Sequence, residues 1–170
     1  ESDVDIRVNA QFTALSCTAT GGVLGSAGTT TVHANFDDSV PNTWYGAALA
    51  NSLAGIDLDP ATNDINSNFN ANLGTTGCLD NSGWYYGLDG NTPAGKTNFL
   101  NVVMHEIAHG LGFSGFGSVI TGAPLAGYQD IYSRFAFNNV SNQSWYQMTD
   151  AGRVAAVIGG NVAFRGPIVT

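Results

Sequence analysis

The feature that most constrains the fold is the segment NFLNVVMHEIAHGLG at residues 98–112. Its apolar residues recur at helical spacing, which predicts a helix over Asn98–Gly110. His105 and His109 are four residues apart, so a helix places both imidazoles on one face. The sequence therefore predicts a helix that carries two histidines side by side.

Histidines at this spacing can present two ring nitrogens to one zinc ion, at Zn–N distances of ~2.0–2.1 Å. Glu106 stands next to His105 on the same side of the helix and can act as a general base on water without being a ligand. An HExxH pattern also arises by chance, but its position inside the predicted helix favours a metallopeptidase. His33, the only other histidine, lies in a predicted strand and is interpreted as structural.

Composition limits the class of protein. A chain of 170 residues is read as one domain, residues 1–170. Its net charge of -8, with only 5 Lys and Arg, argues against nucleic acid and anionic membranes as partners. No apolar run approaches the ~20 residues that cross a bilayer. The single lysine and the many Asn, Ser, Thr and Gly residues favour a secreted, extracellular protein whose signal peptide has been removed.

Period-two alternation and turn residues predict the other elements. Strands are expected at Asp3–Ala10, Val32–Phe36 and Asp64–Phe69, helices at Asn42–Leu53 and from about Thr149, and loops at Thr18–Thr31 and Asp80–Lys96. Thr97 or Asn98 can cap the central helix. Short strands followed by a buried helix predict an α+β domain.

Two cysteines leave two possibilities open. A disulfide between Cys17 and Cys78 would close a loop of about 60 residues and stabilise the fold by ~4 kcal/mol in an oxidising compartment. Two buried thiols are equally compatible with the sequence.

A glycine at position 112, three residues after His109, allows the chain to turn sharply after the helix. The string HEIAHGLGF resembles the metzincins, and among them the leishmanolysin-like branch. Most of the chain is similar to secreted bacterial metallopeptidases that carry a protease-associated domain, through NTWYGAALANSLAG, DINSNFN, WYYGLDG, NFLNVVMHEIAHGLGF, GYQDIYSRF, WYQMTD and FRGPIV.

The resemblance implies a metzincin-like catalytic domain with a small twisted mixed sheet and a zinc-binding active-site helix. It implies a zinc-dependent endopeptidase that acts on protein or peptide substrates, with His105 and His109 as metal ligands and Glu106 as the catalytic base. It further implies that DINSNFN is an edge strand along which an extended peptide lies.

The third zinc ligand is not evident. The usual position is filled by Gly115, and no histidine follows His109. The resemblance implies that a third histidine and a methionine turn lie beyond Thr170, so that the chain lacks the C-terminal part of the catalytic unit and a further segment or chain supplies the ligand. An alternative within the chain is Asp130. A third possibility is a binding or assembly module that retains the peptidase fold with an incomplete zinc site.

Three other groups have simpler interpretations. Asp150 stands where a carboxylate favours a helix N-terminus, and Met148 is expected in the core. The string DLDPATNDINSN offers oxygen ligands for calcium, but it lacks the glycine and the final glutamate of an EF-hand loop, so a solvated turn is favoured. The candidate calcium ligands are Asp57, Asp59, Asn63 and Asp64.

Overall fold

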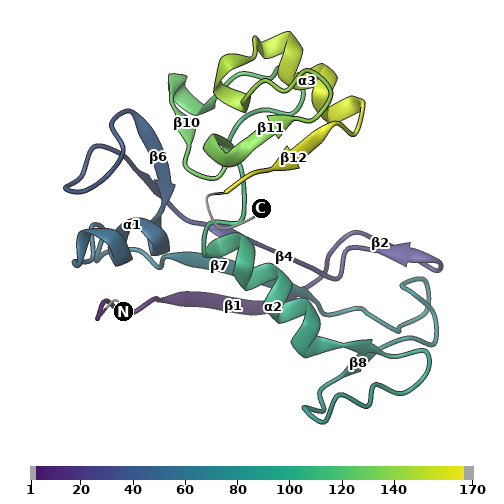
Figure 1. Cartoon of the computed structure of the whole chain (residues 1–170). Coiled ribbons are helices and arrows are strands. Elements are labelled where there is room, and N and C mark those ends of the chain that lie inside the picture. Colours follow the sequence, from purple (N-terminus) through teal and green to yellow (C-terminus); the bar gives the residue numbers. More distant parts are fainter. Residues whose placement is uncertain (1–2, 167–170) are drawn as a thin grey trace.

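A computed structural model describes residues 3–166. The end of the FRGPIV string lies outside this range. The main sheet and α2 form one part of the molecule, and the chain after α2 folds into a second lobe above it (Figure 1). Small sheets and helices occur together, which confirms the α+β prediction.

The elements have the following bounds. The strands are β1 Val8–Thr13, β2 Cys17–Thr18, β3 Gly21–Gly22, β4 Gly25–Thr29, β5 Val32–His33, β6 Thr43–Gly46, β7 Ile65–Asn70, β8 Trp84–Tyr85, β9 Thr97–Asn98, β10 Gln129–Asp130, β11 Ala136–Asn138 and β12 Val162–Phe164. The α-helices are α1 Ala47–Ala54, α2 Phe99–Gly110 and α3 Asp150–Ile158. Three 3-10 turns lie at Leu125–Gly127, Ser133–Phe135 and Trp145–Gln147.

The main sheet has the strand order β1-β7-β4, with β1 parallel and β4 antiparallel to β7. The prediction that DINSNFN forms an edge strand is therefore wrong, because β7 is central. Two of its asparagines pair across the sheet: Asn9 Nδ2 donates to Asn66 Oδ1 at 3.0 Å and Gln11 Nε2 donates to Asn68 Oδ1 at 2.8 Å. Paired amides thus allow an asparagine-rich strand to occupy the middle of the sheet.

The predicted loop Thr18–Thr31 is also wrong, because it contains most of the β2–β3 hairpin and the whole of the sheet strand β4. β4 reads GSAGT, a composition that normally indicates a turn. Here its small residues lie under α2, which packs on β4 and β7. Close approach of helix and sheet explains a strand made of such residues.

The first strand begins later than predicted, at Val8 instead of Asp3. Ile6 and Val8 are exposed, so the apolar alternation of DVDIRVNA does not mark a buried face. The strand is held at its other end, where the Phe12 ring stacks on Phe99 with centroids 5.4 Å apart. The position of this strand is thus decided by long-range packing.

The predicted helix Asn42–Leu53 is confirmed only in its second half. Trp44 and Tyr45 lie in β6, which pairs with β5 and β10, in keeping with the preference of aromatic residues for strands. α1 follows and ends, as expected, at Gly55, whose φ of 69° is left-handed.

Aromatic packing orders part of the predicted loop Asp80–Lys96. β8 lies within it and pairs in parallel with β9. The Trp84 ring meets Phe99 edge-on at 5.2 Å, and its Nε1 donates to the Asn70 carbonyl at 2.9 Å. This tryptophan is therefore a packing residue.

Cys17 and Cys78 form a disulfide, with Cα atoms 5.0 Å apart. The bond joins the β2–β3 hairpin to the turn after β7, and both thiols are accounted for. Linking two residues 61 positions apart stabilises the fold by about 4 kcal/mol in the chain-entropy model.

The second lobe is organised around α3, which confirms the helix predicted from about Thr149. The Thr149 hydroxyl caps it by accepting from Gly152 N at 3.1 Å. Arg153 is buried and donates to the carbonyls of Gly122 and Met148, each at 2.6 Å. Met148 is buried as predicted, and Asp150 in the first turn pairs with Arg153.

Within residues 3–166, no helix is both long enough and apolar enough to span a bilayer.

Candidate metal centre

α2 presents the HExxH residues, and its N-terminus is well defined. The Asn98 side chain caps the helix by accepting from Asn101 N at 3.1 Å. Phe99 anchors the first turn because its ring contacts Phe69 with centroids 4.9 Å apart. The predicted helix over Asn98–Gly110 is confirmed, with Asn98 as its cap.

Two glycines bring α2 close to the sheet. A Cβ added at Gly110 would lie 2.4 Å from the Ile65 Cγ2, and a Cβ added at Gly25 would lie 2.9 Å from the Glu106 Cγ. Both distances are shorter than side-chain atoms tolerate. Glu106 is therefore held against β4, and its side chain is only 7% exposed.

The two histidines face one another. The Nε2 atoms of His105 and His109 lie 3.1 Å apart, and the ring planes are perpendicular. Two nitrogens bound to one tetrahedral zinc at ~2.0–2.1 Å are separated by about 3.3 Å. The observed pair thus fits zinc with a shift of a few tenths of an ångström.

The second nitrogen of His109 is held by the backbone. His109 Nδ1 lies 2.9 Å from the carbonyl oxygen of Phe113. A carbonyl can only accept, so Nδ1 carries the proton and Nε2 keeps its lone pair for a metal. The chain reaches this position through Gly112, whose φ of 115° is accessible to glycine but strained for other residues. The sharp turn expected at Gly112 is present.

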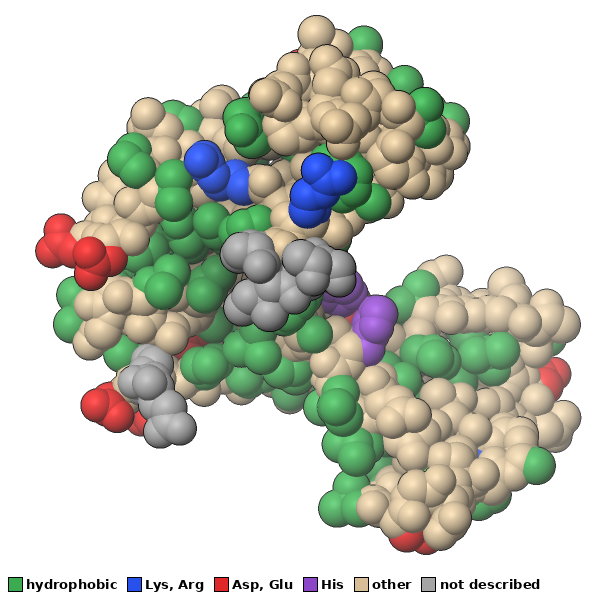
Figure 2. Space-filling view, in the orientation of Figure 1, with side chains coloured by type: hydrophobic (Ala, Val, Ile, Leu, Met, Phe, Trp, Pro, Cys, Tyr) green, Lys and Arg blue, Asp and Glu red, His purple; other side chains and the backbone are tan. Residues whose placement is uncertain are grey.

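His105 and Glu106 line one hollow of about 410 Å³, together with Leu24, Gly25, Asn101 and Val102. Figure 2 shows histidine side chains at the base of a hollow between the two lobes. A ligand in this space would meet an imidazole and a carboxylate that point from consecutive positions of one helix. The wall formed by Leu24 and Gly25 was not foreseen, although a glycine inside a strand signals close approach.

Asp130 has a structural role and does not join the histidines. Its Oδ1 accepts from Ser133 N at 2.7 Å, and its Oδ2 accepts from Phe116 N and Ser133 Oγ, each at 2.9 Å. The part of the chain that the structure describes contains no group of three His, Cys, Asp or Glu residues that could hold a metal. Asp130 thus has hydrogen-bond partners of its own, and its role as a third ligand stays a prediction.

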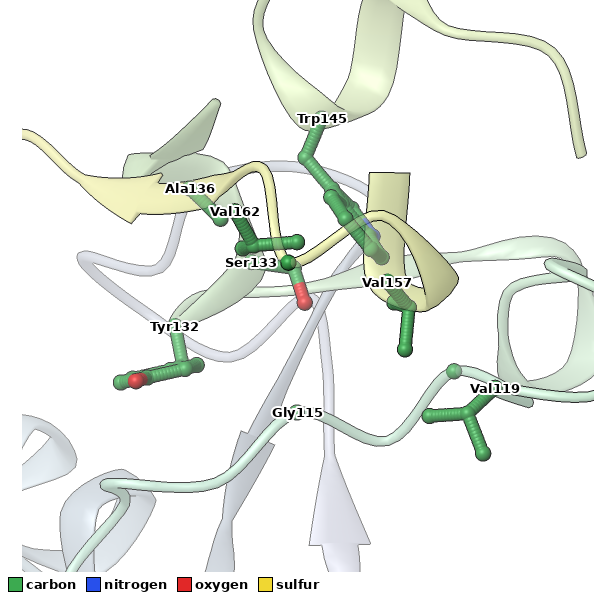
Figure 3. A pocket seen from close by; sticks show the side chains of 10 residues that line it. Gly115, Val119, Tyr132, Ser133, Ala136, Trp145, Val157 and Val162 are labelled. Carbon is green, nitrogen blue, oxygen red and sulfur yellow. The ribbon is translucent and has the colours of Figure 1, made fainter. Parts of the chain in front are cut away.

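The position expected for a third ligand, Gly115, opens on a different cavity. Gly115 and Ser133 border a pocket of about 390 Å³ in the second lobe (Figure 3). Its other labelled walls are mainly apolar side chains, such as Trp145 and Val157. The pocket contains neither histidine and is distinct from the hollow beside Glu106.

The candidate calcium ligands have partners of their own. Arg7 donates to Asp57 Oδ2 at 2.7 Å and to the Pro60 carbonyl at 2.9 Å. Asn51 Nδ2 donates to Asp64 Oδ1 at 2.7 Å. A guanidinium and an amide thus supply the hydrogen bonds that these oxygens accept, which supports the interpretation as a turn.

His33 agrees with its structural interpretation. It lies in β5, and its Nε2 pairs with the Thr31 hydroxyl at 3.1 Å.

The chain was compared with protein-family models, with curated proteins and with solved structures, and none of the three comparisons gave a match. The residues of α2 therefore carry the functional evidence in this chain.

Proposed function

We propose that the chain is the catalytic domain of a secreted, zinc-dependent endopeptidase of the metzincin type. The observation that carries this proposal is the 3.1 Å separation of the His105 and His109 Nε2 atoms, with His109 oriented by a backbone carbonyl. Without a metal, the same pair is explained by a single hydrogen bond between the imidazoles. Glu106 lines one hollow with His105, and this proximity favours the metal site.

In this proposal His105 and His109 hold the metal. Zinc bound there supplies a Lewis acid that polarises a peptide carbonyl and makes a water molecule more acidic. Glu106 accepts the proton of the attacking water and passes it to the leaving amine nitrogen. The backbone at Gly25 keeps the carboxylate in place, and Phe113 keeps the His109 ring in the tautomer that a metal requires.

We further propose that a histidine from another segment or another chain completes the ligand set. Catalytic zinc sites take three protein ligands, and His105 and His109 supply two. His105 is exposed, so a ligand from outside can reach the pair.

Metal analysis and hydrolysis of an unstructured protein together test the proposal. The chain should take up zinc, and Glu106→Gln should keep the zinc but lose hydrolysis by about 10²-fold or more. The control is Asp5→Asn, which removes an exposed carboxylate far from Glu106 in the sequence. It should behave as wild type. A chain that neither takes up zinc nor cleaves points instead to the binding or assembly module.

Imidazole in solution tests the missing ligand separately. It can occupy the third position in place of a histidine side chain, so it should strengthen zinc binding by the wild-type chain. His109→Ala leaves one protein ligand and should show no comparable gain. An equal gain in both proteins would contradict the proposed ligand set.

A further inference from the structure

Two arginines converge on one hollow of the second lobe. Arg134 and Arg165 line a space of about 280 Å³ with the polar residues Asn142, Ser144 and Tyr146. No acidic residue lines it. Figure 2 shows blue Lys and Arg side chains at separate places on the upper part of the molecule.

These two guanidinium groups have no carboxylate partner among the described residues. The ion pairs found between residues 3 and 166 are Arg7 with Asp57 and Arg153 with Asp150. The chain has 5 Lys and Arg against 13 Asp and Glu, so acidic partners are plentiful elsewhere. Two positive charges that line one space without an acidic residue beside them favour an anion in that space.

Arg134 Nη1 donates to the Thr43 hydroxyl at 3.2 Å. The other N–H groups of Arg134, and most of those of Arg165, remain available as donors. The Arg165 guanidinium carbon lies 4.2 Å from the centre of the Phe137 ring, and that of Arg134 lies 5.8 Å from the centre of the Tyr146 ring. A ring contact occupies the face of a guanidinium and leaves the N–H groups at its edge for a planar acceptor. Asn142 Oδ1 accepts weakly from Arg165 at 3.5 Å, which leaves its amide N–H₂ as a third donor.

We propose that this hollow binds the carboxylate of an acidic side chain in a peptide. The edge of a guanidinium matches the planar, two-oxygen geometry of a carboxylate, and a space of about 280 Å³ suits one amino-acid side chain. An endopeptidase substrate continues in both directions, which favours an internal Asp or Glu over a chain terminus. The interpretation of this site as a substrate preference rests on the proposed function. The binding of a carboxylate in the hollow is independent of that function.

Calorimetric titration of the full chain carrying Glu106→Gln tests binding without cleavage of the probe. Three peptides of otherwise equal sequence are compared: one with an internal Glu and blocked ends, one with Gln at that position and blocked ends, and the Gln peptide with a free C-terminal carboxylate. The Glu peptide should bind about tenfold more tightly than the blocked Gln peptide, as expected for a charge-assisted hydrogen bond.

Arginine variants locate the effect. Arg165→Gln and Arg134→Gln should each remove most of the preference for Glu. Arg165→Lys keeps the charge but loses the planar fork, so it should retain only part of the preference. Lys96→Gln, which removes an exposed positive charge from another region, should leave the preference unchanged. Thermal unfolding of each variant identifies any loss of fold.

Four results would overturn the inference. They are equal binding of the blocked Glu and Gln peptides, a preference that survives in folded Arg165→Gln, equal loss in Lys96→Gln, and tighter binding of the peptide with a free C-terminal carboxylate than of the Glu peptide. These results are separable from the proposed function. A chain that hydrolyses protein without a preference for Glu would support the peptidase and contradict the carboxylate site. A chain that prefers Glu but never cleaves would support the carboxylate site and contradict the peptidase.

Discussion

Gly25 of β4 faces Glu106 of α2 so closely that a Cβ at residue 25 would lie 2.9 Å from the Glu106 Cγ. The backbone of one strand thereby sets how far the carboxylate extends from the helix. A residue with no side chain is thus part of the geometry that positions the proposed base.

Gly25→Ala should displace Glu106 and slow peptide hydrolysis. A misplacement of about 1 Å can cost ~10²-fold in rate, while His105 and His109 keep their zinc. The measurement is kcat/KM together with zinc content. Gly28→Ala is a matched control in the same strand, because a Cβ there meets no atom within 4 Å. Equal losses in the two variants would show that Gly25 has no special relation to Glu106.

Gly110→Ala should destabilise the fold, because its Cβ would lie 2.4 Å from the Ile65 Cγ2. Overpacking of this kind costs ~1–3 kcal/mol, against a gain of up to about 1 kcal/mol from the helix propensity of alanine. Urea unfolding measures the difference. Adding Ile65→Ala should make the double variant more stable than the sum of the single effects predicts. Strict additivity would argue against a direct clash.

Asp130→Asn should weaken the fold but not the binding of zinc. The substitution removes a charge that accepts three hydrogen bonds from Phe116 and Ser133, at a cost of ~1–3 kcal/mol. Unfolding and metal titration are measured on the same preparation. Loss of zinc from a folded Asp130→Asn chain would support Asp130 as the third ligand.

Tyr85 and Asp89 should titrate as a pair. The Tyr85 hydroxyl donates to Asp89 Oδ1 at 2.5 Å. This bond lowers the pKa of Asp89 below its ordinary 3.8 and raises the pKa of Tyr85 above 10.0. The contribution of Asp89 to the stability of the fold is therefore present above pH ~3.8 and is lost as the pH falls through its lowered pKa. The contribution of Tyr85 to the stability is lost as the pH rises through its raised pKa.

Tyr85→Phe should move the pKa of Asp89 up towards 3.8, as followed by NMR of the carboxyl carbon. The shift should be partial, because Asn91 N still donates to Asp89 Oδ1 at 2.9 Å. Tyr86→Phe is the control and should leave the Asp89 titration unchanged. An unaltered curve in Tyr85→Phe would mean that the hydrogen bond is absent in solution.

Local patterns predicted the central part of the candidate site well. The spacing of His105 and His109 becomes a spatial relationship as soon as the segment is helical. Thr97 or Asn98 was expected to cap that helix, and Asn98 does. The turn at Gly112 was foreseen for the same reason, since only a glycine adopts its backbone angle without strain.

Long-range pairing was not predictable in the same way. DINSNFN was expected at an edge and lies in the centre of the sheet, and the glycine-rich segment before it supplies β4 instead of a loop. Short-range composition indicates turn residues, but it does not show that a helix will cover them. The disulfide partner of Cys17 likewise became definite only in the folded chain.

The sequence by itself determined a capped helix with two histidines one turn apart, because hydrogen bonding and periodicity within twelve consecutive residues suffice to define both. Only the tertiary structure decided that Glu106 is held against Gly25, that Asp130 serves the backbone of a neighbouring loop, and that Arg134 and Arg165 share a hollow. Each of these relationships joins segments far apart in the chain, and contacts between such segments arise from the packing of the whole fold.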